Sequence, residues 1–333
     1  MNIIRARGIN QAYNDALWLM NSVGQPYSTR NGGAQRAPGP VMTEYTHPTE
    51  RVLFDTKRDA NPYFHFMEAI WMLAGRQDIE FVSKFNSTIG QFSDDGVILR
   101  GVYGYRWRHW FGMDQLAWII AILCHDPTTR RAVISMWDTR RDIEAVVAGT
   151  RDVPCNTSIY FSPDKDRLNM TVNNRSNDII WGCYGANAVH LSMLHEFIAL
   201  AAGFKVGTYY QFSNDWHMYD LHKHLLEERS TEYIDHYTHI EPLPLLNGTT
   251  DTAAGFLYAC EKFCEWVLNP KSIVGSAFAT KSSYIASVAI PMYQSWRAHK
   301  NGDYYKARQF ARDIEAEDWS IACVQWLVKR WEQ

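Results

Sequence analysis

A single thiol, Cys155, is followed twenty residues later by a guanidinium and three polar side chains in Arg175-Ser176-Asn177-Asp178. An arginine beside a thiol stabilises the thiolate, which is the nucleophilic form of cysteine. Cys155 is therefore a candidate covalent catalyst. Most free cysteines, however, are small buried hydrophobic residues, and the Pro-Cys-Asn context alone does not decide between the two interpretations.

A hairpin would bring these groups together. Apolar residues alternate in residues 157–161 and again in 168–172, and Ser-Pro-Asp-Lys-Asp between them is typical of a turn. Two antiparallel strands joined in this way would place Cys155 near the polar run that begins at Asn173.

Two further groups could take part in chemistry. Glu68 lies inside an apolar helix predicted over residues 62–74, where a carboxylate is costly unless it is paired or placed for proton transfer. A salt bridge at the helix edge explains it equally well. Residues 27–36 are predicted to form a loop whose glycines and whose Arg30 and Arg36 suit an anion, although most such loops are solvated turns.

The remaining elements follow from periodicity and breakers. Helices are predicted over residues 9–22, 114–124, 188–202, 252–268, 282–299 and 303–331, and strands over 130–137 and 206–213. Gly203 is a plausible helix stop.

These motifs, in this order, resemble the thymidylate synthase family, including its pyrimidine-nucleotide hydroxymethylase branch. The matching residues are Thr56-Lys57-Arg58, Glu68, Val102-Tyr103-Gly104 with Arg106-Trp107, Asp126-Pro127, Arg130-Arg131, Pro154-Cys155, Arg175-Ser176-Asn177-Asp178, Gly182, Asn187 and Asp215-Trp216-His217-Met218-Tyr219. The resemblance implies an α+β fold with a twisted mixed sheet, helices on one face and the other face available for a homodimer. It implies a catalytic domain over residues 1–245, with residues 246–333 as a helical extension packed on it.

The resemblance also implies roles for individual residues. Cys155 would add to C6 of a deoxypyrimidine monophosphate, and C5 would then attack the one-carbon unit of 5,10-methylenetetrahydrofolate. Glu68 and Tyr103 would move protons at the base, and Arg175 would activate the thiol. The phosphate would be held by Arg30, with Arg36 as the alternative, by Arg175 and Ser176, and by Arg130 and Arg131 across the dimer interface. His217 and Tyr219 would bind the 3′ hydroxyl, and Asp178 and Gly182 the folate.

Asn187 would read the base, because an amide matches N3–H and O4 of uracil. The spacing from Gly182 is one residue longer than usual, and without that insertion Ala186 would take this position. An amide can also turn to serve cytosine, so dCMP stays open as the substrate.

Three departures favour hydroxymethylation of dUMP over reductive methylation. Asn156 stands where the synthases usually have histidine, Gly90 and Ser93 lie where they carry tryptophan, and their closing tail has no match at residues 330–333. A wetter pocket would let water add to the reactive methylene. Methylation stays the main alternative, and a nucleotide-binding or RNA-binding protein without turnover is the alternative of another class.

Composition limits the other classes. The net charge of −3 argues against a general nucleic-acid binder, and six scattered cysteines without a CxxC pair indicate reduced thiols in the cytoplasm. Cys260 and Cys264 could share a metal but more simply pack in a core, so no metal is expected. No signal peptide and no apolar run of about 20 residues is present, so no membrane is expected.

Overall fold

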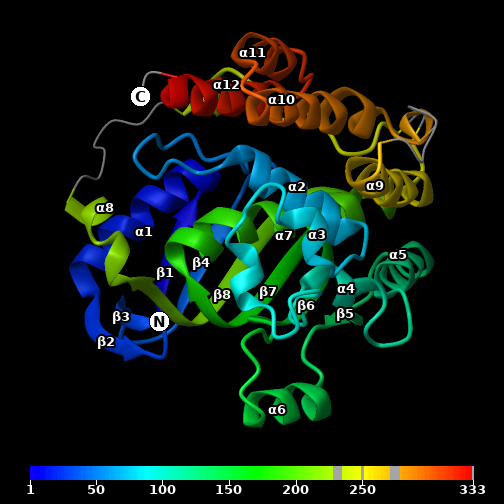
Figure 1. Cartoon of the computed structure of the whole chain (residues 1–333). Helices are drawn as coiled ribbons and strands as arrows, with labels where there is room; N and C mark the ends of the chain where they lie inside the picture. Colours follow the sequence, from blue (N-terminus) through cyan, green and yellow to red (C-terminus); the bar gives the residue numbers. More distant parts are fainter. Residues whose placement is uncertain (228–234, 249–250, 271–277, 332–333) are drawn as a thin grey trace. The chain divides into compact units, whose positions relative to one another are not determined.

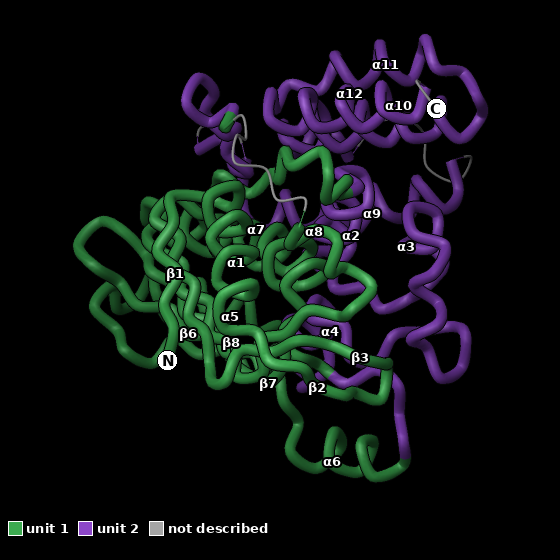
Figure 2. Tube along the Cα trace, turned by 90° about the vertical axis from the view of Figure 1, so that its left-hand side faces the viewer, with its two compact units in different colours: residues 1–60, 114–148, 154–235 green, residues 61–113, 149–153, 236–333 purple. Residues whose placement is uncertain are grey.

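The computed structural model describes residues 1–227, 235–248, 251–270 and 278–331, and it divides into two compact units (Figures 1 and 2). The first unit comprises residues 1–60, 114–148 and 154–235, and the second comprises residues 61–113, 149–153 and 236–333. The chain passes from the second unit to the first directly before Pro154 and Cys155. The boundary expected at residue 245 lies inside the second unit and stays a prediction.

A mixed sheet forms the centre of the first unit, with the strand order β1-β4-β8-β7-β6-β5 and the β2–β3 hairpin attached to β8. β1 with β4 and β7 with β8 are parallel pairs, and the other pairs are antiparallel. The predicted α+β class with a mixed sheet is confirmed. The strands are β1 (Asn2–Ala6), β2 (Gln25–Thr29), β3 (Gly32–Arg36), β4 (Val41–Tyr45), β5 (Ala132–Ser135), β6 (Asn156–Asp164), β7 (Arg167–Asp178) and β8 (Lys205–Tyr219).

Helices cover one face of this sheet, where α1 and α7 lie in Figure 1. Along β7, Leu168, Met170 and Val172 are buried, whereas the alternate residues Thr171 and Asn173 are partly exposed. Successive strand residues point to opposite faces, so the second face of the sheet is the half-exposed one. The helical segments of this unit are α1 (Ile9–Val23), α5 (Gln115–His125), α6 (Thr139–Val147), η2 (Ile179–Ala186), α7 (Asn187–Ala201), η3 (Asp220–His222) and α8 (His224–Glu227).

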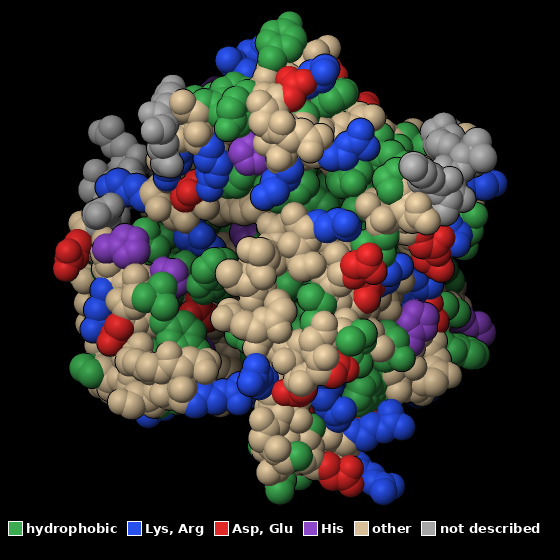
Figure 3. Space-filling model, viewed as in Figure 1, with side chains coloured by type: hydrophobic (Ala, Val, Ile, Leu, Met, Phe, Trp, Pro, Cys, Tyr) green, Lys and Arg blue, Asp and Glu red, His purple; other side chains and the backbone are tan. Residues whose placement is uncertain are grey.

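Helix α6 presents charges of both signs to solvent. Arg140, Arg141 and Glu144 are exposed, and Arg140 pairs with Glu144 across one turn. Figure 3 shows basic and acidic side chains together at the lower end of the face in view, where α6 lies. These mixed charges do not make α6 a basic element of the kind that binds nucleic acid.

Three of the sequence predictions in this unit were wrong in extent, and one of them is the strand over residues 130–137, which spans only Ala132–Ser135. Residues 27–36 are not a loop: most of them lie in β2 and β3, which pair antiparallel, with Arg30 and Asn31 as a two-residue turn between Thr29 and Gly32. Gly32 has φ +114°, which a glycine adopts without strain. The predicted strand over residues 206–213 extends to Tyr219, because pairing with β7 continues beyond its apolar alternation.

Helix α2 (Pro62–Leu73) is the centre of the second unit, and every one of its residues is buried, Glu68 included. The Asn61 side chain accepts a hydrogen bond from the Phe64 backbone N–H, and this cap fixes the start of the helix. Aromatic side chains from the C-terminal helices pack on it, among them Trp319, whose ring centroid lies 5.1 Å from that of Phe66. Burial on all sides explains why the whole segment is apolar.

The other helical segments of the second unit are α3 (Ile79–Val82), η1 (Ile89–Phe92), α4 (Tyr103–Arg108), η4 (His236–Thr238), α9 (Ala253–Leu268), η5 (Ala279–Lys281), η6 (Ile285–Ala289), α10 (Ile290–Lys300), α11 (Tyr304–Arg312) and α12 (Glu317–Trp331). The predicted helix over residues 303–331 was wrong as a single element, since residues 313–316 separate α11 from α12. Of the tail residues 330–333, Glu332 and Gln333 lie outside the described residues.

Cys260 and Cys264 are both fully buried in α9, so the prediction that they pack in a core is confirmed. Among the described residues, no three His, Cys, Asp or Glu side chains gather closely enough to hold a metal. In that same part of the chain, none of the helices is both long enough and apolar enough to cross a bilayer.

Candidate active site

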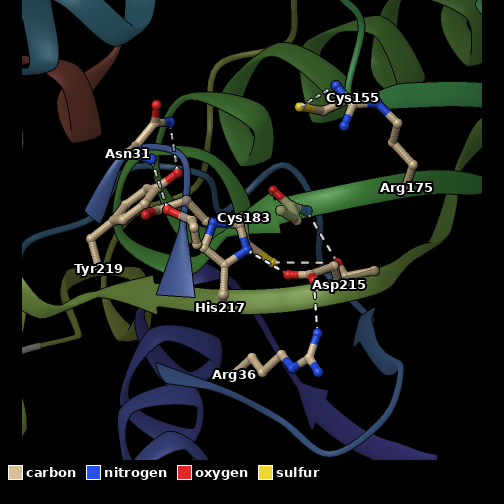
Figure 4. A network of polar contacts seen from close by, with 12 residues as sticks. Asn31, Arg36, Cys155, Arg175, Cys183, Asp215, His217 and Tyr219 are labelled. Carbon is tan, nitrogen blue, oxygen red and sulfur yellow. Dashed lines mark hydrogen bonds and ion pairs between the residues drawn. The ribbon is translucent and has the colours of Figure 1, made fainter. Parts of the chain in front are cut away.

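Cys155 and Arg175 lie in contact at the start of the β6–β7 hairpin (Figure 4). The Arg175 backbone N–H donates to the Cys155 carbonyl at 2.9 Å, and Nε donates to the Pro154 carbonyl at the same distance. Nη2 then lies 3.8 Å from the half-buried Cys155 Sγ. The predicted proximity of thiol and guanidinium is confirmed, and a cation at this distance favours the thiolate.

Parallel pairing of β7 with β8 joins two motifs that are far apart in the sequence. Ser176 pairs with Asp215 and Asp178 pairs with His217 along the two strands. The polar residues that follow Arg175 therefore lie beside the Asp-Trp-His-Met-Tyr run. Both groups lie at the carboxyl ends of these two central strands.

His217 is held by Asp215 of β8, which also lies near Arg36 of β3. Its Nδ1 lies 2.9 Å from Asp215 Oδ1, and Arg36 Nη1 lies 3.7 Å from Asp215 Oδ2 (Figure 4). Burial disfavours the imidazolium, but the Asp215 hydrogen bond and the Asp178 carboxylate outweigh it, so the pKa of His217 is raised. The same hydrogen bond lowers the pKa of Asp215.

The β2–β3 hairpin brings its turn to Tyr219, since Ala34 of β3 pairs with Tyr219 of β8. Asn31 Nδ2 donates to the Tyr219 hydroxyl at 3.2 Å (Figure 4). Arg30, the neighbour of Asn31 in the turn, is exposed, whereas Arg36 is engaged with Asp215 and stacks 4.2 Å from the Tyr27 ring centroid. The hairpin therefore presents Arg30 beside Tyr219.

The extra residue between Gly182 and Asn187 lies in the π-helical segment η2, which is kinked at Tyr184 and Gly185, where the backbone angles are not helical. Such turns accommodate one additional residue in a helical segment and are frequent at functional sites. The Asp178 carboxylate caps η2, because its Oδ1 accepts from the backbone N–H groups of Ile180 and Trp181, each at 2.7 Å. Asn187 then begins α7, and its Nδ2 donates to Asn177 Oδ1 at 3.1 Å.

Asp178 Oδ2 is buried and accepts no hydrogen bond from the residues that the structure describes. Burial raises the pKa of this carboxyl group. Gly182 is close by in sequence, and a Cβ at this glycine would lie 2.8 Å from Asn177 Oδ1. The buried Oδ2 of Asp178 is therefore an acceptor that is available to a polar ligand.

Arg130 and Arg131 are exposed and precede β5, which begins at Ala132. They are therefore not strand residues, and the alternation that would send them to opposite faces does not apply. Glu68 and Tyr103 belong to the second unit, where both are buried, Glu68 in α2 and Tyr103 at the start of α4.

Sequence reasoning assigned no role to Asn177, Asp215, Ser213 or Asn31, although all four contact the site. The spacing of Asp215 and His217, two apart on a strand, was a usable signal, because such residues share a face. The contact between Asn177 and Asn187 had no such signal, since it depends on the π-helical turn.

Comparison with known proteins adds three relatives. The family model described as Thymidylate synthase matches residues 11–245. The chain is 38% identical over 348 aligned positions to a deoxyuridylate hydroxymethyltransferase of Pseudomonas phage M6, covering 99% of this chain and 95% of the relative. It is 36% identical to the protein of the same name from Bacillus phage SP01, covering 63% of this chain and 56% of that protein. A thymidylate synthase of Symbiobacterium thermophilum is 32% identical, with 46% of this chain and 57% of the relative covered.

Proposed function

The chain belongs to the thymidylate synthase family, and from this premise we propose that it is a deoxyuridylate hydroxymethyltransferase. It transfers a one-carbon unit from 5,10-methylenetetrahydrofolate to C5 of dUMP, and water completes the hydroxymethyl group. The observation that carries the proposal is the contact between Cys155 Sγ and Arg175 Nη2 at 3.8 Å, beside the paired polar ends of β7 and β8.

Cys155 supplies the nucleophile. Its thiolate adds to C6 of uracil, which turns C5 into a carbon nucleophile that attacks the one-carbon unit. Loss of the C5 proton and cleavage of the bond between the transferred carbon and the folate nitrogen would release tetrahydrofolate. Water would then add to the transferred carbon, and loss of the C6–S bond would restore the ring. Arg175 holds the thiolate by charge, while its Nε is fixed on the Pro154 carbonyl.

The nucleotide is bound at both ends of its sugar. Arg30, Arg175 and Ser176 hold the phosphate, together with Arg130 and Arg131 of the partner subunit, because forked guanidinium groups suit a dianion. His217 and Tyr219 bind the 3′ hydroxyl, and their orientation is set by Asp215 and Asn31. Asn187 reads N3 and O4 of the base.

Glu68 and Tyr103 handle protons at the base. Glu68 is buried in the apolar helix α2, and the role that the family resemblance gives to this carboxylate is to order water near O4. Tyr103 stands at the first turn of α4 and receives the proton that leaves C5.

The folate fits the group formed by Asp178 and Gly182. The buried Oδ2 of Asp178, which accepts no hydrogen bond from the described residues, can accept from a pterin N–H, and Gly182 lies four residues further along the chain. Bound there, the folate supplies a one-carbon unit at the oxidation level of formaldehyde.

Hydroxymethylation is preferred over methylation for two reasons. The relative that is similar over nearly the whole chain bears the hydroxymethyltransferase name. In addition, Gly90 lies in η1, a short 3₁₀ helix without a buried side chain, at the place where synthases carry tryptophan. A less enclosed methylene is open to water rather than reserved for hydride.

A homodimer is proposed through the half-exposed face of the sheet. Val133 is 40% and Tyr160 is 42% exposed on this face, which is unusual for apolar strand residues. None of the six cysteines, all of which lie in the described part of the chain, forms a disulfide, and this supports a reducing compartment, the cytoplasm.

The test uses dUMP labelled with tritium at C5, incubated with methylenetetrahydrofolate. We expect tritium release, 5-hydroxymethyl-dUMP by mass spectrometry, and tetrahydrofolate rather than dihydrofolate. Stoichiometric dihydrofolate with dTMP would establish methylation in place of hydroxymethylation. Binding of dUMP without any tritium release would instead identify a nucleotide-binding protein that has lost turnover.

The matched variant is Cys155→Ser, which should release no tritium while its affinity for dUMP stays within about tenfold of wild type. An active Cys155→Ser variant would remove this thiol from its role.

A further inference from the structure

Asn187 does not stand alone at the proposed base site, because a second amide holds it. Asn177 Oδ1 accepts from Asn187 Nδ2 at 3.1 Å, and Asn177 Nδ2 donates to Ser213 Oγ, also at 3.1 Å. We propose that Asn177 is a specificity-determining residue that fixes which way the Asn187 amide faces and thereby selects uracil over cytosine. This inference rests on the proposed function and names a further residue for it.

The direction of the pair follows from what each amide can offer. Asn177 is 3% exposed and Ser213 is 1% exposed, so the pair they form is shielded from water. Because the Nδ2 side of Asn177 faces Ser213 Oγ, its carbonyl oxygen is the group that faces Asn187. With Asn177 in this orientation, a turned Asn187 would bring two carbonyl oxygens together and leave the buried Asn177 oxygen without its donor, which is unfavourable.

Gly182 and the π-helical turn complete the arrangement. A Cβ at Gly182 would lie 2.8 Å from Asn177 Oδ1 and 3.1 Å from Asn187 Nδ2, so a side chain there would enter the contact between the two amides. The turn η2 carries the extra residue that puts Asn187, rather than Ala186, at the first position of α7. Both features favour one geometry of the amide pair.

A fixed amide distinguishes the two bases. Uracil offers a donor at N3 and an acceptor at C4, whereas cytosine offers an acceptor at N3 and a donor at C4. A freely turning Asn187 could serve either base, but an amide held by Asn177 presents its acceptor and its remaining N–H in one order only. The Asn187 amide held by Asn177 therefore favours dUMP. With dCMP, the groups at N3 and at C4 would both face the wrong atom of the amide.

The experiment compares kcat/KM for dUMP and for dCMP in wild type and three variants. Asn177→Leu removes the acceptor at nearly constant volume, and Asn177→Asp keeps an acceptor toward Asn187. Asn174→Leu is the matched control, because Asn174 is an equally buried amide on β7 that donates to the Phe212 carbonyl.

We expect the preference for dUMP to fall by about tenfold or more in Asn177→Leu, through a gain in kcat/KM for dCMP. It should change by less than about threefold in Asn177→Asp and Asn174→Leu. A general loss of structure would lower kcat/KM for both substrates by the same factor and leave their ratio unchanged. If Asn177→Leu does not fold, Ser213→Ala, which frees Asn177 to turn, should lower the ratio in the same direction.

The inference would be overturned if folded Asn177→Leu had the wild-type ratio of kcat/KM for dUMP to kcat/KM for dCMP. The same holds for Ser213→Ala if that variant is used instead. Turnover of dUMP by wild type would in either case leave the proposed function intact. Absence of turnover with either nucleotide in wild type would overturn the proposed function first. Measuring wild type before the variants therefore separates the two failures.

Discussion

At the scale of single residues, the site depends on how one guanidinium is held. Arg175 uses its backbone N–H and its Nε on the carbonyl groups of Cys155 and Pro154, and this leaves Nη2 directed at the sulfur. The backbone at Pro154 and Cys155 therefore positions the Arg175 guanidinium beside the Cys155 thiol. Removal of the guanidinium should change the reactivity of Cys155 without moving it.

We expect Arg175→Leu to slow alkylation of Cys155 by iodoacetamide at pH 7 by about tenfold, because less of the thiol is ionised without the cation. The rate is read from the peptide that contains Cys155 by mass spectrometry. Arg167→Leu is the control, since Arg167 is also exposed on β7 but donates to the Val206 carbonyl. Cys183 is an internal reference for an unreactive thiol, because burial raises its pKa to about 12. Equal rates in wild type and Arg175→Leu would contradict the assigned electrostatic role.

The sequence was informative about residues whose partners lie across a regular hairpin. The alternation around Cys155 predicted the β6–β7 pairing and, with it, the contact to Arg175. It could not predict the contact between Asn177 and Asn187, because a π-helical turn has no period that distinguishes it from an ordinary helix start.

At the scale of elements, the parallel pairing of β7 and β8 assembles the site. The predicted strand over residues 206–213 was too short because polar residues at Asn214 and Asp215 interrupt its apolar alternation. Beyond these two residues the strand stays buried at Trp216 and Met218, and it also carries His217 and Tyr219 of the site. The alternation of apolar residues is broken by the polar residues, so it does not predict this end of the strand.

The ion pair on β8 predicts a pH effect. Asp215→Asn should lower the pKa of His217, because the variant removes the negative charge and leaves only a neutral, weaker hydrogen-bond acceptor. The titration is followed by NMR of the imidazole resonances. Asp166→Asn, which affects the separate pair with Lys205, should leave the His217 midpoint unchanged. An unchanged midpoint in Asp215→Asn would mean that Asp178 alone raises the pKa of His217.

The same pair sets the sign of its contribution to stability. The raised pKa of His217 contributes stability that is complete below the unfolded value of 6.5 and is lost as pH rises through the folded pKa. The lowered pKa of Asp215 contributes stability that is complete above 3.8 and is lost as pH falls through the folded pKa. Both contributions are therefore complete between about pH 3.8 and 6.5.

In the second unit, α4 lies against α2 with no room for a side chain at Gly104. A Cβ there would lie 2.0 Å from the Met72 carbonyl oxygen, which is backbone and cannot turn aside. We expect Gly104→Ala to lower the free energy of unfolding by about 2–3 kcal/mol, measured in urea. Gly90→Ala is the control, because its Cβ would lie 3.8 Å from Ile79 Cγ2, an ordinary contact. A Gly104→Ala variant as stable as wild type would show that α4 can shift from α2.

At the scale of the whole molecule, the sequence predicted the class of the fold and most of its helices, but not its division into compact units. Contiguous ranges were expected, with a boundary at residue 245. The structure instead assembles the second unit from three separate segments, two of which lie within residues 1–245. Contacts between segments distant in the chain decide such units, and local periodicity carries no information about those contacts.

The proposed sharing of arginines between subunits gives the last prediction. Cys155→Ser and the double variant Arg130→Ala with Arg131→Ala should each be inactive as pure dimers. If Arg130 and Arg131 serve the partner subunit's site, a mixed dimer contains one site with both defects and one intact site. Random exchange of equal amounts makes half of the dimers mixed, so activity should recover to about a quarter of wild type.

The fraction of activity that mixing recovers shows whether Arg130 and Arg131 act in the partner subunit's site or in their own, whichever surface forms the interface. Arginines that acted within their own subunit would leave every site of a mixed dimer defective, and no activity would return on mixing. Exposed Arg130 and Arg131 precede β5, the strand whose Val133 lies on the half-exposed face, so the proposed interface would carry them toward the partner. If the mixture is no more active than the two separate variants, the proposal that the subunits share arginines is wrong. The catalytic role of Cys155 does not depend on this outcome.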